Sequence, residues 1–245
     1  MILNVLLWVG MILGTFGLIL LGYRLFGFYG LIAFGALALI IANIQVLKQV
    51  TILGLAATLG NVVFSATFLT TDIASEIYGK AKAKLIIHIG FFSMIAFLAL
   101  SQLTLLFAPA PGDWASPHLE ALFTILPRIT IASLISYFLS NRHDVWAFDF
   151  WKKKLPGDNK LWVRNNASTL VSQLLDSFVF SFIAFLGVFP LMVVVEIALS
   201  TYIFKVLVAA ADTPFIYLAR WMHRTGRTGL FLNKDEIVDV PALDA

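Results

Sequence analysis

The sequence predicts an all-α fold, a polytopic bundle of transmembrane helices, and three observations support this. Of the 245 residues, 60% are hydrophobic and only 13% are charged, whereas an ordinary soluble domain has about 25% charged residues. The mean hydropathy is +0.91. The apolar residues form long runs, each near the roughly 20 residues that a helix needs to cross a hydrocarbon core. Such runs alternate too little for the strands of a membrane barrel, so we expect helices.

Seven apolar runs predict seven spans in a single membrane domain, residues 1–245. The first run lacks a preceding basic region and is longer than the apolar part of a typical signal peptide, so we expect it to be retained. Gly79 is expected to end the third span, because glycine readily caps a helix. The predicted spans are residues 3–22, 28–47, 51–78, 85–107, 119–140, 166–186 and 191–221.

The distribution of lysine and arginine predicts the orientation of the spans, since these residues are enriched in cytoplasmic loops. With the N-terminus outside and the C-terminus cytoplasmic, most of them fall on the inner side, while the loops "APAPGDWASPH" and "GVFP" on the outer side contain none. The net charge of +3 is therefore a topology signal, and no nucleic-acid partner is expected. The inner-side residues are Arg24, Lys80, Lys82, Lys84, Arg142, Lys152, Lys153, Lys154, Lys160, Arg164, Arg220, Arg224, Arg227 and Lys234.

Two segments are expected to lie at the inner membrane surface. The stretch "NRHDVWAFDFWKKKLPGDNKLWVRN" mixes tryptophans with lysines, which is typical of an interfacial segment among lipid headgroups. Residues 223–245 are expected to form a cytoplasmic tail, which becomes acidic after Gly229.

Polar side chains inside the spans are the candidates for function, because an ionised residue at the bilayer centre costs about 2.5 to 3.5 kcal/mol. Asp72 and Glu76 lie one turn apart on one helical face, and Lys205 and Asp212 share another face. Asp72 is expected to lie deeper in the membrane than Glu76, where it either lines a cavity or takes part in ion coupling. Glu76 is expected to pair with a cation near the inner surface. The alternative is that these residues only form ion pairs that fix helix packing. The candidate substrate-binding residues are Asn43, Gln45, Lys48, Phe68, Asp72, Glu76, Arg128, Gln173, Asp176 and Lys205.

Catalytic and metal-binding motifs are not found in the sequence. The four histidines are scattered, there is no cysteine, and neither a nucleotide-binding loop nor a nucleophile elbow is present. We therefore predict no catalytic residues, no metal and no cofactor. Gly10, Gly14 and Gly17 form a small-residue face that suits helix contact, either within the chain or in a homodimer.

Five blocks occur in order along the chain: "ANIQVLKQVTILG", "FLTTDIASEIYGKAKAK", "RITIASLISYFLSNRHDVWAF", "WVRNNASTLVSQLLDSFVFSFIAF" and "FKVLVAAADTPFIYL". Together they resemble the queuosine precursor transporter family, also described as vitamin uptake transporters of the inner membrane. The resemblance covers residues 42–218 and is most specific in the Asp-x-x-x-Glu-x-Tyr-Gly and Arg-Asn-x-x-Ser-Thr-x-x-x-Gln-x-x-Asp patterns. It implies a six-helix core, residues 28–222, preceded by an extra helix, residues 1–27, in the cell inner (plasma) membrane.

The resemblance implies import of a 7-deazaguanine base, in its cyano or aminomethyl form, for synthesis of the tRNA nucleoside queuosine. Such a base offers N–H donors that a carboxylate accepts, and a carbonyl that amide or cationic side chains satisfy. We expect Asp176 or Glu76 to accept from the donor edge, and Gln173, Asn43 or Lys205 to meet the carbonyl. Phe68 is a candidate for stacking on a planar ligand, and Arg128 for holding a carboxylate in place.

Two modes of energy supply remain open from the sequence. One is secondary transport, driven by protons through Asp72, Asp176 or Asp212. The other is a membrane subunit that binds a purine-like or vitamin-like molecule and depends on a separate ATPase module, since this chain has no Walker motif.

Overall fold

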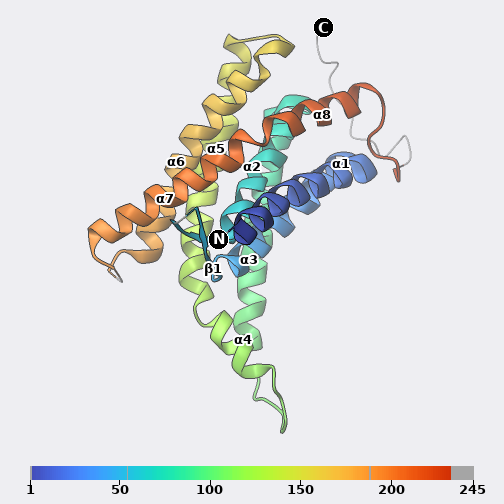
Figure 1. The fold of residues 1–245 in the computed structure, drawn as a ribbon. Helices are drawn as coiled ribbons and strands as arrows, with labels where there is room; N and C mark the ends of the chain where they lie inside the picture. Colours follow the sequence, from blue (N-terminus) through green and yellow to red (C-terminus); the bar gives the residue numbers. More distant parts are fainter. Residues whose placement is uncertain (1, 54, 188, 233–245) are drawn as a thin grey trace.

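The computed structural model describes residues 2–53, 55–187 and 189–232, and shows a bundle of helices with one short hairpin (Figure 1). The prediction of a predominantly helical fold is confirmed. The elements are α1 (Ile2–Gln45), β1 (Gln49–Ile52), β2 (Leu55–Thr58), α2 (Gly60–Ile77), α3 (Lys80–Thr104), α4 (Ser116–Phe123), α5 (Leu126–Lys154), η1 (Asp158–Lys160), α6 (Leu161–Phe185), α7 (Leu191–Ala210) and α8 (Thr213–Arg224).

By length and apolar composition, four stretches of the described chain can each cross a membrane, namely α1, α3, α6 and the α7–α8 stretch. The pair α4 and α5, bent by 41°, would make a fifth. The protein is thus a multi-pass membrane protein. The count of seven spans is not reproduced by this measure, and the orientation of the termini stays a prediction.

Helix α1 reverses direction at Gly27, whose φ of 56° and ψ of −136° are not helical. The two halves fold back so closely that the backbones of Gly22 and Gly30 are in contact, with no room for a side chain at Gly30. This reversal lies between the first two predicted spans. Apart from the neighbouring backbone of their own helix, Gly10, Gly14 and Gly17 have no described residue within 4 Å of where a Cβ would stand, and their packing on a second copy stays a prediction.

Helix α2 lies at the centre of the bundle, and every residue from Gly60 to Ile77 is buried. It packs against α1, α3, α5, α7 and α8. Surrounded by protein and not by lipid, it can carry polar side chains that would be costly on a lipid-facing helix. Gly79, with a φ of 83°, separates α2 from α3 and confirms the predicted helix end.

The predicted start of the third span at residue 51 is wrong, because β1 and β2 form an antiparallel hairpin with Val50 opposite Ala57. The β-branched residues of "QVTI" suit a strand, and a short apolar run cannot by itself distinguish strand from helix. Asp72 therefore lies about 18 Å along a shorter helix, at 1.5 Å per residue, and not about 30 Å along a longer one.

Two further boundaries correct the sequence predictions. The expected interfacial segment is mostly helical, since α5 continues to Lys154 and buries Asp144 and Phe148 on its inner face. The last predicted span is broken: α7 ends at Ala210, Asp212 precedes α8, and Pro214 occupies the first turn of α8, where proline is favoured. Lys205 and Asp212 thus lie on different elements and do not share a helix face. Residues 233–245 of the predicted tail lie outside the described residues.

Candidate functional site

A small pocket lies where the end of α1 and the start of α2 meet α5, α6 and α7. It combines two aromatic rings with a buried carboxylate, a buried ammonium group and two asparagines. The space that it encloses is small, about 20 Å³, which is room for about one water molecule. A larger ligand therefore enters only if the side chains that line the pocket move apart. Its lining residues are Ala42, Asn43, Val46, Gly60, Asn61, Phe64, Ser133, Ser136, Asp176, Phe180 and Lys205.

Asp176 on α6 and Lys205 on α7 form a buried ion pair in the wall of this pocket. Ser140 Oγ lies 3.2 Å from Asp176 Oδ1. The Lys205 ammonium also lies 4.5 Å from the centroid of the Phe64 ring, within the range of a cation–π contact. The pocket therefore presents a hydrogen-bond acceptor and a donor side by side.

Asn43 supplies a further acceptor. Its Nδ2 donates to the Leu39 carbonyl at 3.0 Å, which fixes the amide, while the buried Oδ1 has no partner among the described residues. A buried polar atom without a partner costs free energy. Asn43 is therefore suited to accept a hydrogen bond from a ligand.

Asp72 lies outside this pocket, in a second polar group between α2, α5, α6 and the α7–α8 break. Its Oδ2 accepts from Thr169 Oγ1 at 3.3 Å. Asp212 accepts from Asn165 Nδ2 at 2.9 Å, and Asp144 on α5 is completely buried beside Asp72. Among the residues that the structure describes, no lysine, arginine or histidine forms an ion pair with these three carboxylates.

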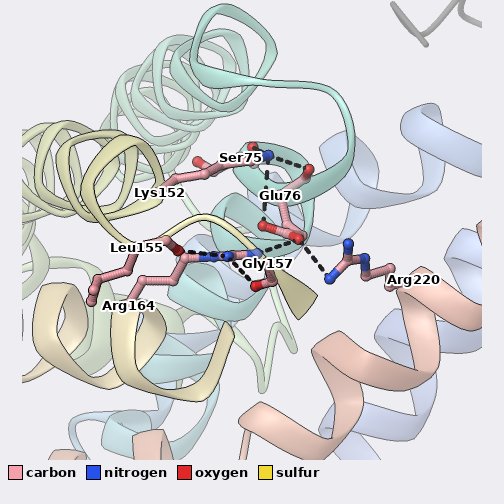
Figure 2. Close-up of polar contacts among 7 residues, drawn as sticks. All are labelled: Ser75, Glu76, Lys152, Leu155, Gly157, Arg164 and Arg220. Carbon is pink, nitrogen blue, oxygen red and sulfur yellow. Dashed lines mark hydrogen bonds and ion pairs between the residues drawn. The ribbon is translucent and has the colours of Figure 1, made fainter. Parts of the chain in front are cut away.

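Glu76, one turn further along α2, has the opposite surroundings (Figure 2). Its Oε1 lies 2.6 Å from Arg164 Nη2 and 3.2 Å from Arg220 Nη1. Lys152 Nζ lies 3.6 Å from Oε2 and donates to the Glu76 carbonyl at 2.6 Å. Arg164 also donates to the Gly157 carbonyl at 3.0 Å. The predicted pairing of Glu76 with a cation is confirmed.

The structure separates the sequence candidates into those that line the pocket and those that do not. Asn43, Asp176 and Lys205 line it. Phe68 is one turn away and packs on Phe64, with ring centroids 6.3 Å apart. Gln173 is buried on α6 without a hydrogen-bond partner among the described residues.

The remaining candidates lie at helix ends. Gln45 and Lys48 are at and just beyond the end of α1, and Lys48 is exposed. Arg128 donates to the carbonyls of Leu186 at 2.8 Å and Ile183 at 3.4 Å. The expectation that Arg128 holds a carboxylate is therefore wrong, because it satisfies backbone carbonyls at the end of α6.

Asp144 and Arg164 were missed as functional candidates because both fell in the predicted interfacial segment. A helical signal was nevertheless present. Ser136, Ser140 and Asp144 are spaced by four on α5, and all are buried. Ser168, Ser172 and Asp176 repeat that spacing on α6, so two polar stripes face each other across the bundle.

Comparison with known proteins bears on what these groups do. Residues 58–219 match the family described as "Putative vitamin uptake transporter". A relative from Bacillus subtilis (strain 168), named "Probable queuosine precursor transporter", is 39% identical over 215 residues, or 88% of this chain and 94% of the relative. The chain belongs to the queuosine precursor transporter family.

A second member of this family, the "Queuosine precursor transporter" of Escherichia coli (strain K12), is 34% identical over 181 residues, or 72% of this chain and 78% of that protein. No solved structure matches the chain. These matches confirm the resemblance to the queuosine precursor transporter family. Because this is a family of transporters, they also confirm the prediction that the chain is not an enzyme.

Proposed function

We propose that this protein imports a queuosine precursor, a 7-deazaguanine base in its cyano or aminomethyl form, across the inner membrane by secondary transport. Two relatives with extensive coverage carry the name of a queuosine precursor transporter. The bundle supports a transport role, since its central helix α2 is buried along its whole length and carries polar side chains.

The observation that carries the proposal is the Asp176–Lys205 pair in the pocket wall. The guanine-like edge of the base places ring N–H and exocyclic amine donors beside a carbonyl acceptor. A carboxylate accepts from the two donors, and an ammonium group donates to the carbonyl. Each group of the ion pair is the other's partner in the structure, so the base would replace those contacts without leaving either charge unsatisfied.

The rest of the pocket suits a flat aromatic ligand. Phe64 and Phe180 provide ring faces or edges on which a planar base can pack. Asn43 Oδ1 is a further acceptor for an amine donor. In this proposal Asp176 accepts from the base, Lys205 donates to its carbonyl, and Phe64 takes the stacking role first assigned to Phe68.

Binding of 7-cyano-7-deazaguanine to the purified protein, measured by isothermal titration with guanine for comparison, tests the pocket. Asp176→Asn and Lys205→Met should each weaken binding by about tenfold or more, the equivalent of about 1.4 kcal/mol. Glu196→Gln is the matched control, because Glu196 is an exposed carboxylate on α7 outside the pocket. Unchanged affinity in both pocket variants would rule out this site.

Uptake by the purified chain alone in liposomes tests the mode of transport. Accumulation without any other protein would exclude dependence on a separate ATPase module. Uptake that appears only when an ATPase partner is added would overturn the proposal of secondary transport.

A further inference from the structure

Asp72 and Asp144 form a carboxyl pair that the proposed base site does not use. Asp72 comes from α2 and Asp144 from α5, and neither side chain is exposed. The two carboxyl groups are close enough to interact electrostatically, and a hydrogen bond between them would need one of them to be the donor. A carboxylate is only an acceptor, so two ionised groups cannot form that hydrogen bond.

The hydroxyls of Ser168, Ser172 and Thr169 lie around Asp144, but in the structure each of them is directed to another acceptor. Ser168 donates to the Asn165 carbonyl at 3.0 Å, Ser172 to the Ser168 carbonyl at 2.9 Å, and Thr169 to Asp72. Both oxygens of Asp144 and Oδ1 of Asp72 consequently lack a donor among the described residues. Three buried oxygens on two neighbouring side chains are thus unpartnered.

A proton is the ligand that satisfies this arrangement. Two buried, adjacent negative charges without a cation are strongly unfavourable, and such pairs keep one carboxyl protonated. One proton supplies the missing O–H donor and removes one of the two charges. A metal ion fits less well, because no group of three or more histidine or carboxylate side chains in the described chain is placed to hold one.

Among the described residues, no cation forms an ion pair with either carboxyl group. Asp212, at the α7–α8 break, accepts from Asn165 and adds a third carboxyl group. The cations in the neighbouring parts of the bundle contact other carboxylates: Lys152, Arg164 and Arg220 contact Glu76, and Lys205 contacts Asp176.

We propose that Asp72 and Asp144 hold one proton between them and that this proton is the coupling ion of transport. The second part rests on the proposed function. Proton binding changes the charge of the pair from −2 to −1, and release restores −2 with the proton passing to water on the other side of the membrane. No other reactant is required.

A short polar route links the pair to the helix surface and to the base pocket. His143 is half-buried on α5, and its Nδ1 lies 2.9 Å from Ser172 Oγ, next to Asp144. Ser172 is one turn from Asp176 on α6, and Ser140, one turn from Asp144 on α5, contacts Asp176. Ser140 and Ser172 thus lie between Asp144 and Asp176, so a change of charge at Asp144 can alter the hydrogen bonds of Asp176 in the pocket wall.

Infrared spectroscopy of the purified protein at neutral pH tests the shared proton without any substrate. The wild type should show the C=O stretch of a protonated carboxyl group that shifts in heavy water. The signal should disappear in both Asp72→Asn and Asp144→Asn, since the remaining carboxylate then accepts from the asparagine amide. It should persist in Asp113→Asn, which alters an exposed carboxylate. A wild type without the signal, or a signal lost only in Asp212→Asn, would overturn the proposal.

Transport by liposomes tests the coupling. Wild-type protein should accumulate labelled 7-cyano-7-deazaguanine when the outside is acidic, whereas Asp144→Asn should exchange the base across the membrane without accumulating it. Accumulation by Asp144→Asn equal to wild type would refute the coupling role. A wild type that neither binds nor exchanges the base would refute the proposed function and, with it, the coupling role, while the infrared result would still decide whether the pair holds a proton.

Discussion

Asp72 and Glu76 occupy successive turns of the same buried helix, yet their surroundings are opposite. Glu76 contacts three cations contributed by α5, α6 and α8. Asp72 contacts a threonine and a second carboxyl group, and no cation pairs with it in the described part of the chain. The two residues share a sequence pattern and a degree of burial, so the difference comes from which helices pack against each turn.

The comparison teaches that a bundle can bury a carboxylate in two ways with different consequences. A carboxylate that is paired with cations stays ionised, because loss of either partner leaves a buried charge uncompensated. Paired with another carboxyl group, it must bind a proton, and that proton can leave. We infer that the Glu76 turn holds the helices together and the Asp72 turn changes its charge during transport.

The largest expected effect is at Glu76. Replacing it with alanine leaves the buried Arg164 guanidinium without its carboxylate, which should lower the free energy of unfolding by about 3 to 5 kcal/mol. Reversible unfolding of the purified protein in detergent measures the loss. A Glu76→Ala protein as stable as wild type would contradict the structural role of this turn.

A double-mutant cycle sharpens the same contrast. Glu76→Gln and Arg164→Met should each destabilise the protein, and the double variant should lose less than the sum, with a coupling free energy of about 0.5 to 3 kcal/mol. The cycle Asp72→Asn with Thr169→Val serves as the comparison and should give a smaller coupling. Equal couplings in the two cycles would show that the two turns do not differ.

A smaller effect is expected at the carboxyl pair. Asparagine has the shape of a protonated aspartic acid and can donate to the remaining carboxylate, so Asp72→Asn or Asp144→Asn should change the free energy of unfolding by about 1 kcal/mol or less. Thermal unfolding in detergent measures this. A loss as large as that of Glu76→Ala would mean that Asp72 is held as a fixed charge.

The smallest effect is expected at Asp113, an exposed carboxylate before α4. Ser116 Oγ donates to Asp113 Oδ2 at 2.6 Å and the Ala115 amide donates to Oδ1 at 2.8 Å, and these bonds lower the pKa of the carboxyl group. The group is therefore ionised at neutral pH, and its contribution is lost only as the pH falls through its lowered pKa. Asp113→Asn should leave the melting temperature unchanged at neutral pH, whereas a marked drop would show that exposed carboxylates also matter to the fold.

The sequence predicts part of this account. The long apolar runs predict the helices, and the inward polar residues include Asp176 and Lys205, which meet in the pocket. The pairing of Glu76 follows from its position near a run of basic residues. Its main partner, Arg164, could not be found this way, because only tertiary packing takes it from a supposed loop into the core.

The failures have physical reasons of the same kind. The run "QVTILGLAAT" is as apolar as a helix, so composition could not show that its residues pair as strands. Asp144 was missed because the tryptophans and lysines that follow it favour a membrane interface, although the four-residue spacing from Ser140 indicates one continuing helix face. Arg128 could not be distinguished from a substrate ligand, since its carbonyl partners belong to the end of another helix.

The central claim is that the base enters together with a proton. The most direct test is to measure the external pH of weakly buffered liposomes that contain the purified protein. When 7-cyano-7-deazaguanine is added outside, entry of the base with a proton should make the external solution transiently more alkaline. The change should vanish in Asp144→Asn and persist in Glu196→Gln. Entry of the base into wild-type liposomes without any change in external pH would contradict the account.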